Sequence, residues 1–237
     1  MKDKTVRILS TRPLDEALVN KAYQNKIILD SISFIRTTDI TDISISDQIQ
    51  NLAGREATLV FTSVNAAKAV IKNLDKYYLQ PAWRIYCING ATETFIREHL
   101  ASAQIVGTGV NADRLSQTLI SDKVSEVIFF CGDQRRDELP QQLAKSNIPV
   151  EEIVIYETKE IPVKVEKEYD GFLFFSPSAV KSFFAVNSID PDTVLFSIGT
   201  TTALAIKSIC DNRVIISGFP SKEALVEVAI KHFGSEN

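Results

Sequence analysis

The strongest constraint on the fold is an internal repeat. Three segments resemble three later segments, in the same order and with offsets of about 110 residues. The matched pairs are TLVFTSVNAAKAV (58–70) with FLFFSPSAVKSF (172–183), IYCINGATETFI (85–96) with LFSIGTTTALAI (195–206), and QIVGTGVNADRL (104–115) with VIISGFPSKEAL (214–225). An ordered series of matches predicts two structurally related halves.

The repeat also wraps around the start of the chain. The segment VIFFCGDQRRDELPQQLAKSNIPVEEIVIYET (127–158) resembles VRILSTRPLDEALVNKAYQNKIILDSISFIRT (6–37). A wrapped order means that one half is inserted into the other. The alternative is a chance similarity between generic strand–helix units. Chance rarely produces a series of matches that is both ordered and wrapped.

The wrapped order predicts where the two domains begin and end. The discontinuous domain comprises residues 1–34 plus 163–237, and the inserted domain comprises residues 39–155. Two extended crossings, residues 35–38 and 156–162, would link them. A chain of 237 residues is long enough for two small domains.

Short apolar runs alternate with amphipathic stretches of helix length, which predicts an α/β fold. The runs cover residues 6–10, 27–35, 58–63, 84–89, 104–107, 126–132, 151–158, 171–176, 193–199 and 213–218. Most are continuously apolar, as is typical of strands buried on both faces of a parallel sheet. The stretches between them fit crossover helices, so we expect two five-stranded sheets.

Charge and apolar content exclude several classes of partner. The net charge of -4 and the pI near 5.4 argue against a nucleic-acid surface, which needs clustered Lys and Arg. The start, MKDKTVRILSTR, lacks the apolar core of a signal peptide, and no apolar run reaches the length of a membrane span. We therefore expect a cytoplasmic protein that does not bind a membrane.

The inventory of metal-ligating residues is poor. Cys87, Cys131 and Cys210 lie far apart in or beside apolar segments, where Cys usually packs as a small apolar side chain. His99 and His232 are the only histidines of the chain. We therefore predict neither a metal site nor a histidine-based catalytic triad.

Small polar residues and glycines follow the predicted strands and lead directly into helices. Ligands of open parallel sheets bind outside the carboxyl ends of the strands, and helix N-termini attract carboxylate or phosphate. N-capping alone explains any single turn of this kind, but six turns together predict a donor-rich cleft. No GxGxxG or GxxxxGKS motif is present, so a dinucleotide site and a P-loop are not supported.

The candidate binding residues come from these turns. They are Arg12, Thr62, Ser63, Asn65, Gly90, Thr92, Arg136, Ser176, Ser178, Gly199, Thr201 and Thr202. Arginines 135 and 136 open the predicted helix after Gly132, where they either grip a carboxylate or form a solvated helix start. Tyr156 ends a strand at a domain crossing, where it either reaches the cleft or serves packing.

Six segments in order resemble the uroporphyrinogen-III synthase family. They are TSVNAA (62–67), GATET (90–94), CGDQRRDELP (131–140), VIYET (154–158), FFSPSAV (174–180) and IGTTTALAI (198–206). The resemblance runs over nearly the whole chain. Phe175 stands where the family often has Thr, and Ala67 replaces the usual Val.

The resemblance implies a fold and a reaction. The fold is two flavodoxin-like parallel-sheet domains, joined by a two-stranded linker and hinged around a cleft. The reaction converts the linear tetrapyrrole hydroxymethylbilane to uroporphyrinogen III, with inversion of ring D and loss of water. No cofactor or metal is implied, and we expect a monomer.

The resemblance also assigns roles to residues. It makes Tyr156 the candidate proton donor for loss of the substrate hydroxyl, directly or through water. Thr201 and Thr202 stand at the family's paired-threonine position and become candidate contacts for the substrate carboxylates. Two alternatives stay open: a non-catalytic two-domain binder of a tetrapyrrole or other anionic small molecule, and a glycosyltransferase-like enzyme. The second is disfavoured because the chain is short and has no evident nucleotide loop.

Overall fold

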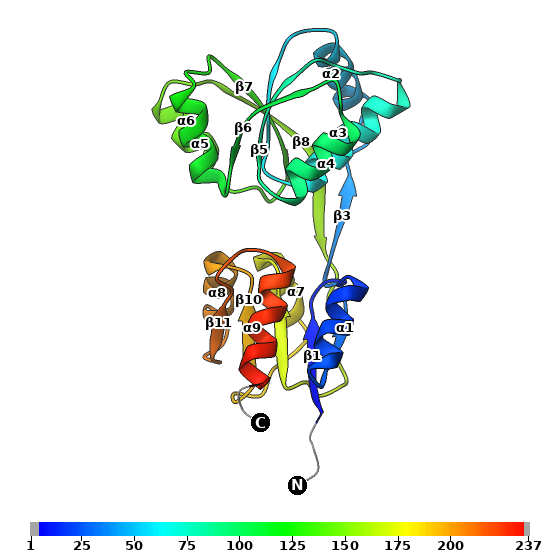
Figure 1. Cartoon of the computed structure of the whole chain (residues 1–237), viewed down its shortest axis with the longest axis vertical. Coiled ribbons are helices and arrows are strands. Elements are labelled where there is room, and N and C mark those ends of the chain that lie inside the picture. Colours follow the sequence, from blue (N-terminus) through cyan, green and yellow to red (C-terminus); the bar gives the residue numbers. More distant parts are fainter. Residues whose placement is uncertain (1–4, 235–237) are drawn as a thin grey trace. The chain divides into compact units, whose positions relative to one another are not determined.

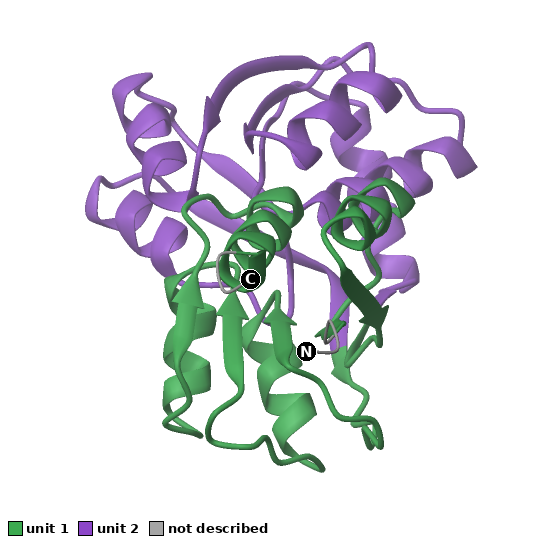
Figure 2. Ribbon diagram, turned by 60° about the horizontal axis from the view of Figure 1, so that its bottom comes forward, with its two compact units in different colours: residues 1–36, 159–237 green, residues 37–158 purple. Residues whose placement is uncertain are grey.

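The computed structural model describes residues 5–234 and contains two compact units. Unit 1 comprises Met1–Arg36 and Lys159–Asn237, and unit 2 comprises Thr37–Thr158. Figure 2 shows the two units in different colours, and Figure 1 labels most of their elements. Each unit has its own sheet and its own helices, and each is therefore an α/β structure by itself.

Unit 1 is a five-stranded sheet in which every pair of neighbouring strands is parallel. Its strands are β1 (Val6–Ser10), β2 (Ile27–Ser31), β9 (Gly171–Phe174), β10 (Val194–Ser197) and β11 (Val214–Ile216). Its helices are α1 (Glu16–Gln24), α7 (Pro177–Phe184), α8 (Thr200–Lys207) and α9 (Lys222–Gly234). One apolar cluster packs α1 and α9 on one face of the sheet, and another packs α7 and α8 on the opposite face.

Unit 2 is built around a six-stranded sheet. Its strands are β3 (Ile35–Asp39), β4 (Thr58–Phe61), β5 (Arg84–Ile88), β6 (Gln104–Gly109), β7 (Val127–Gly132) and β8 (Val150–Glu160). Its helices are α2 (Ile43–Ala53), α3 (Val64–Lys76), α4 (Ala91–His99), α5 (Ala112–Ser121) and α6 (Glu138–Lys145). Helices α2, α3 and α4 contribute to one apolar cluster, and α5 and α6 contribute to a second.

The two sheets have the same spatial strand order once the wrapped repeat is taken into account. Unit 1 has the order β11-β10-β9-β1-β2, and unit 2 has β6-β5-β4-β7-β8 followed by β3. The first is the flavodoxin-like order. The second becomes the same order when β7 is matched to β1 and β4 to β9, as the sequence repeat pairs them. The predicted fold class, two flavodoxin-like parallel-sheet units, is confirmed.

The expectation of two five-stranded sheets is wrong for unit 2. The predicted run 27–35 divides after Ser31, and its end joins the next residues as β3, which lies beside β8 at the sheet edge. The Ile40 N–H donates to the Ile155 carbonyl, and the Ile161 N–H donates to the Phe34 carbonyl, so β3 and β8 run antiparallel. The crossing segment forms a strand because pairing satisfies the backbone groups of both chains.

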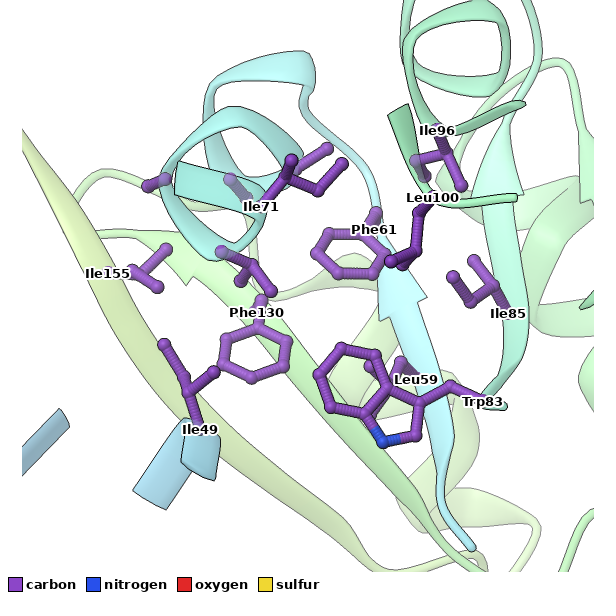
Figure 3. Packing of buried hydrophobic residues seen from close by; sticks show 14 of the residues in the cluster. Ile49, Leu59, Phe61, Ile71, Trp83, Ile85, Ile96, Leu100, Phe130 and Ile155 are labelled. Carbon is purple, nitrogen blue, oxygen red and sulfur yellow. The ribbon is translucent and has the colours of Figure 1, made fainter. Parts of the chain in front are cut away.

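Aromatic side chains from neighbouring strands fill the larger core of unit 2 (Figure 3). The rings of Phe61 and Phe130 stack with centroids 5.6 Å apart, and Trp83 is fully buried. The Trp83 indole N–H donates to the Leu52 carbonyl at 2.9 Å, so this large side chain leaves no unpaired donor. Burial on both faces explains why the strands read as continuous apolar runs.

A backbone difference between the repeats gives a first testable expectation. Gly90 precedes α4 with φ +83° and ψ -130°, a conformation almost closed to residues with a Cβ, whereas its repeat partner Gly199 is extended with φ -177°. We expect Gly90→Ala to lower the free energy of unfolding by about 1–3 kcal/mol. Gly199→Ala should cost only about 0.5 kcal/mol, from weaker N-capping. Denaturant unfolding of both variants measures the difference, and equal losses would contradict the strain at Gly90.

Candidate functional site

Each sheet has one place where the strand order reverses. It lies between β1 and β9 in unit 1 and between β7 and β4 in unit 2. At such a switch point the connections leave in opposite directions, and ligands of this fold bind in the crevice outside the strand ends. The residues that follow these four strands are therefore the first candidates for function.

At the switch point of unit 2, a tyrosine from one strand meets a helix cap from another. The Tyr156 hydroxyl of β8 donates to Ser63 Oγ at 3.1 Å. Ser63 is the N-cap of α3, and its Oγ accepts the Asn65 N–H at 3.1 Å. The structure thus brings together three residues that the sequence singled out. The phenol lies beside the positive end of a helix dipole.

The surroundings of Tyr156 keep its hydroxyl protonated at neutral pH. The side chain is half-buried and packs against the apolar cluster that contains Phe61 and Phe130. Burial raises the pKa of Tyr156, and the hydrogen bond with Ser63 offsets part of that rise. A protonated, partly solvent-accessible phenol can donate a proton to a bound ligand.

The loop after β7 holds the backbone around Tyr156. The Asp133 N–H donates to the Tyr156 carbonyl at 3.1 Å, and Asp133 Oδ1 accepts the Thr158 N–H at 2.8 Å. The Gln134 side chain donates to the Thr158 carbonyl at 2.9 Å. These contacts continue the pairing of β7 with β8 past the end of β7. They fix the backbone of β8 at Tyr156 and Thr158.

The two arginines after β7 do not open the next helix, so that expectation is wrong. Helix α6 begins at Glu138 because Pro140 fits only in the first turn of a helix. Arg135 forms ion pairs with Glu152 and Asp137. Arg136 is exposed and has no hydrogen bond or ion pair within residues 5–234, and it is therefore available to an anion.

At the switch point of unit 1, an arginine lies over an aromatic ring. The Arg12 guanidinium, which follows β1, is 5.5 Å from the centroid of the Phe175 ring, which follows β9. Ser176 is the N-cap of α7, and its Oγ accepts the Ala179 N–H at 3.1 Å. Phe175 is one of the two positions where the sequence departs from the family pattern. It gives Arg12 an aromatic face on which the planar guanidinium is held.

Two helices begin directly after a glycine, which has no side chain to cap them. Gly90 precedes α4 and Gly199 precedes α8, and neither provides a side chain to bond the first N–H groups. A Cβ added at either glycine would meet nothing within 4 Å, so space is open in front of both helices. The N-termini of α4 and α8 can therefore accept a carboxylate through backbone N–H groups.

The predicted threonine contacts divide into buried and exposed groups. Thr92 and Thr202 are only 5% and 2% exposed, so their hydroxyls face the interior of their units and are poorly placed for a direct substrate contact. Thr201 is exposed beside Gly199, and Thr62 and Ser178 are half-buried. Thr201 and Thr202 differ because successive side chains of a helix point in different directions, and Thr202 lies on the buried side of α8 with Ala203 and Ile206.

Two further site residues were not predicted as contacts from the sequence. Asp133 acts through the strand pairing around Tyr156, and Phe175 supports Arg12. The sequence predicts that the Gly132–Asp133 turn ends a strand, but no local pattern predicts which backbone N–H group the Asp133 carboxylate accepts. The contact between Phe175 and Arg12 can be predicted only from the strand order, which places β9 beside β1.

The cysteines give a second testable expectation. Cys87 and Cys131 are fully buried in apolar clusters, and burial raises the pKa of Cys87 to about 12 and that of Cys131 to about 11. Because thiols react as thiolates, we expect a disulfide reagent at pH 8 to modify only Cys210, which is half-buried, in the folded protein. Denaturant should expose the other two thiols. Modification of Cys131 at the rate of Cys210 without denaturant would contradict this burial.

No metal-binding group and no membrane span occur in the part of the chain that the structure describes. Within residues 5–234, no group of three or more His, Cys, Asp or Glu side chains could hold a metal ion. In the same residues, none of the helices is both long and apolar enough to cross a bilayer.

The family comparison decides which group of proteins this chain belongs to. A model of the family described as uroporphyrinogen-III synthase HemD matches residues 16–227, which is most of the chain. The chain belongs to the uroporphyrinogen-III synthase family. The resemblance read from the sequence is confirmed.

Relatives within the uroporphyrinogen-III synthase family differ widely in sequence. The chain is 31% identical over 100 residues to uroporphyrinogen-III synthase of Saccharomyces cerevisiae, a match covering 38% of this chain and 34% of the yeast protein. The match thus spans about a third of the length of that curated relative.

Solved structures of the family share the fold. The synthetase of Helicobacter pylori superposes with a TM-score of 0.71 at 18% identity, covering 96% of this chain and 99% of the other. A mutant synthase of Thermus thermophilus gives 0.66 at 15% identity, with coverage of 98% and 100%. The fold of the uroporphyrinogen-III synthase family is therefore retained here although few residues are identical.

Proposed function

We propose that this chain is a uroporphyrinogen-III synthase of tetrapyrrole and heme biosynthesis. It would cyclise hydroxymethylbilane to uroporphyrinogen III with inversion of ring D and loss of one water. The observation that carries the proposal is the Tyr156 hydroxyl, held on Ser63 at the switch point of unit 2. This is a protonated acid beside a helix N-terminus, in a chain that belongs to the family.

The substrate's eight carboxylates need local partners because the chain itself carries a net charge of -4. Arg12 and Arg136 offer guanidinium groups. The uncapped N-termini of α4 and α8, behind Gly90 and Gly199, offer backbone N–H groups. We propose that these four places bind carboxylates. The hydroxyls of Thr92 and Thr202 are the weakest of the candidate contacts because they are buried.

The proposed chemistry begins with proton transfer from Tyr156. The C–O bond of the hydroxymethyl group breaks with the electron pair on oxygen, and the proton from the phenol converts the leaving group to water. The electron-poor carbon left behind is attacked by the substituted pyrrole carbon of ring D, which gives a spiro intermediate.

Rearrangement and closure complete the turnover. The spiro intermediate opens and recloses with ring D inverted, and the pyrrole carbon that closes the ring loses its proton, which restores the phenol. The net change is loss of water with no oxidation or reduction. We therefore propose that the reaction needs no cofactor. The enzyme's task is to position a flexible chain that otherwise closes without inversion.

Isomer analysis tests the proposed function. Purified protein is mixed with freshly generated hydroxymethylbilane, and the products are separated into types I and III. Formation of type III supports the synthase. A protein that binds the substrate and yields only type I at the protein-free rate would be a non-catalytic tetrapyrrole binder.

We also propose the domain bounds, the oligomeric state and the cellular location of the protein. The two domains, residues 1–34 plus 163–237 and residues 39–155, are joined by linkers 35–38 and 156–162, and the protein acts as a cytoplasmic monomer. The acidic composition argues against a nucleic-acid partner. Size-exclusion chromatography with light scattering tests the monomer, and a dimer mass would overturn it.

A further inference from the structure

We propose that Gly132 is a positioning residue for Tyr156, an inference that rests on the proposed function. A Cβ built on Gly132 would lie 2.4 Å from Tyr156 Cζ, 2.5 Å from Cε2 and 2.8 Å from the hydroxyl oxygen. The phenol ring thus fills the space in which any other residue at position 132 would place its side chain. Only glycine allows the ring to lie there.

The requirement at position 132 is for space and not for an unusual backbone. Among the described residues, Gly90 is the glycine with a positive φ, so Gly132 has no conformation forbidden to alanine. An added methyl group would therefore act on its neighbour and not on its own strand. That neighbour is the ring of the proposed proton donor.

A β-bulge directs the phenol across Gly132. Cys131 is opposite Val154, but Gly132 is opposite Tyr156, so Ile155 is an extra residue in β8. In a regular strand, consecutive side chains face opposite sides, yet Ile155 and Tyr156 both contact the same apolar cluster. The bulge turns Tyr156 toward Ser63, and Gly132 leaves room for that orientation.

The same unit contains a second pair in which a glycine lies opposite a tyrosine ring, although here the extra residue, Val106, lies in the strand of the glycine. Gly107 of β6 is opposite Tyr86 of β5 at another register shift, and a Cβ on Gly107 would lie 2.5 Å from Tyr86 Cε1. Tyr86 is fully buried, and its hydroxyl donates to Asp122 at 2.8 Å. Gly107→Ala is therefore a matched control, with the same change against a tyrosine ring outside the proposed site.

We expect Gly132→Ala to lower kcat by about 10- to 100-fold with little change in KM, because the phenol moves relative to the bound substrate. Gly107→Ala should keep the kcat of the original protein, although both variants become less stable. A wild-type kcat for Gly132→Ala would overturn the proposal. An equal fall in kcat for Gly107→Ala would also overturn it, because it would indicate a general effect of destabilisation.

A double variant separates positioning from independent damage. When Tyr156→Phe has already removed the hydroxyl, adding Gly132→Ala should lower kcat no further, because both changes remove the same proton donor. Adding Gly107→Ala should also leave that kcat unchanged. If Gly132→Ala lowers kcat by the same factor with and without the hydroxyl, its effect does not pass through Tyr156 and the proposal fails.

A spectroscopic measurement tests positioning without relying on activity. Tyrosine is labelled with 13C at Cζ, and the Tyr156 resonance is identified by its loss in Tyr156→Phe. We expect Gly132→Ala to move this resonance and Gly107→Ala to leave it in place. An unmoved resonance in Gly132→Ala overturns the positioning role. Normal turnover of Tyr156→Phe would instead overturn the proposed role of Tyr156 in the reaction.

A folding failure of Gly132→Ala would itself be informative. Replacing the ring in Gly132→Ala/Tyr156→Leu removes the atoms that the new methyl group would meet, so we expect this double variant to recover folding, measured by circular dichroism and denaturant unfolding. Failure to recover would show that the methyl group clashes elsewhere and would overturn the proposal.

Discussion

Tyr156→Phe is expected to lower kcat by about 100-fold or more and to change KM little. The substitution removes one oxygen and keeps the ring that packs over Gly132 and against the apolar cluster of unit 2. The fold should therefore be unchanged, and the loss falls on proton transfer to the leaving hydroxyl. Steady-state kinetics with hydroxymethylbilane gives both constants. An unchanged kcat would remove Tyr156 from the chemistry.

The pH dependence of kcat provides a second test of Tyr156 as the proton donor. An acid must be protonated to act, so kcat should fall as pH rises through its pKa. Burial raises the pKa of Tyr156 above the ordinary tyrosine value of 10, so its contribution to kcat should persist up to about pH 10 and decline above it. Tyr156→Phe should lack this alkaline decline. Tyr77 is an exposed tyrosine at the C-cap of α3, so Tyr77→Phe removes a surface hydroxyl and should leave kcat unchanged.

Phe130→Ala is expected to lower the free energy of unfolding by about 3–5 kcal/mol. Phe130 is fully buried in the middle of β7 and stacks on Phe61 of the neighbouring strand, so truncation leaves a cavity that β4 and β7 cannot fill. Figure 3 shows the ring among Ile49, Phe61 and Trp83. Urea unfolding monitored by circular dichroism measures the loss.

A matched exposed position controls for the loss of an aromatic ring. Tyr23 of α1 is 72% exposed, and alanine favours a helix, so Tyr23→Ala should change the free energy of unfolding by less than about 0.5 kcal/mol. A loss for Phe130→Ala as small as that for Tyr23→Ala would contradict the packing of the unit 2 core.

Local patterns made much of the fold predictable. Continuous apolarity located β7 and β9 because these strands are covered on both faces. Ser63 and Ser176 were recognisable as helix caps, since capping depends on residues only two or three positions away. The wrapped repeat then related the strands of unit 2 to those of unit 1, and the shared strand order agrees with it.

The parts that were not predictable depend on non-local contacts. The bond from Tyr156 to Ser63, 93 residues apart, is set by strand order and register. The inward orientation of Thr202 depends on how α8 is rotated on its sheet, which its weakly amphipathic sequence does not specify. The space over Gly132 arises from a bulge one residue long, and apolar patterns carry no signal for it.

The isomer composition of the product tests the central claim most directly. Hydroxymethylbilane is generated in place, the protein is added at several concentrations, and the products are oxidised to porphyrins and separated into types I and III. We predict that type III predominates, that its rate of formation rises in proportion to protein, and that Tyr156→Phe shifts the product toward type I. Type I alone, formed at the same rate with and without protein, would contradict the assignment of this chain as a synthase.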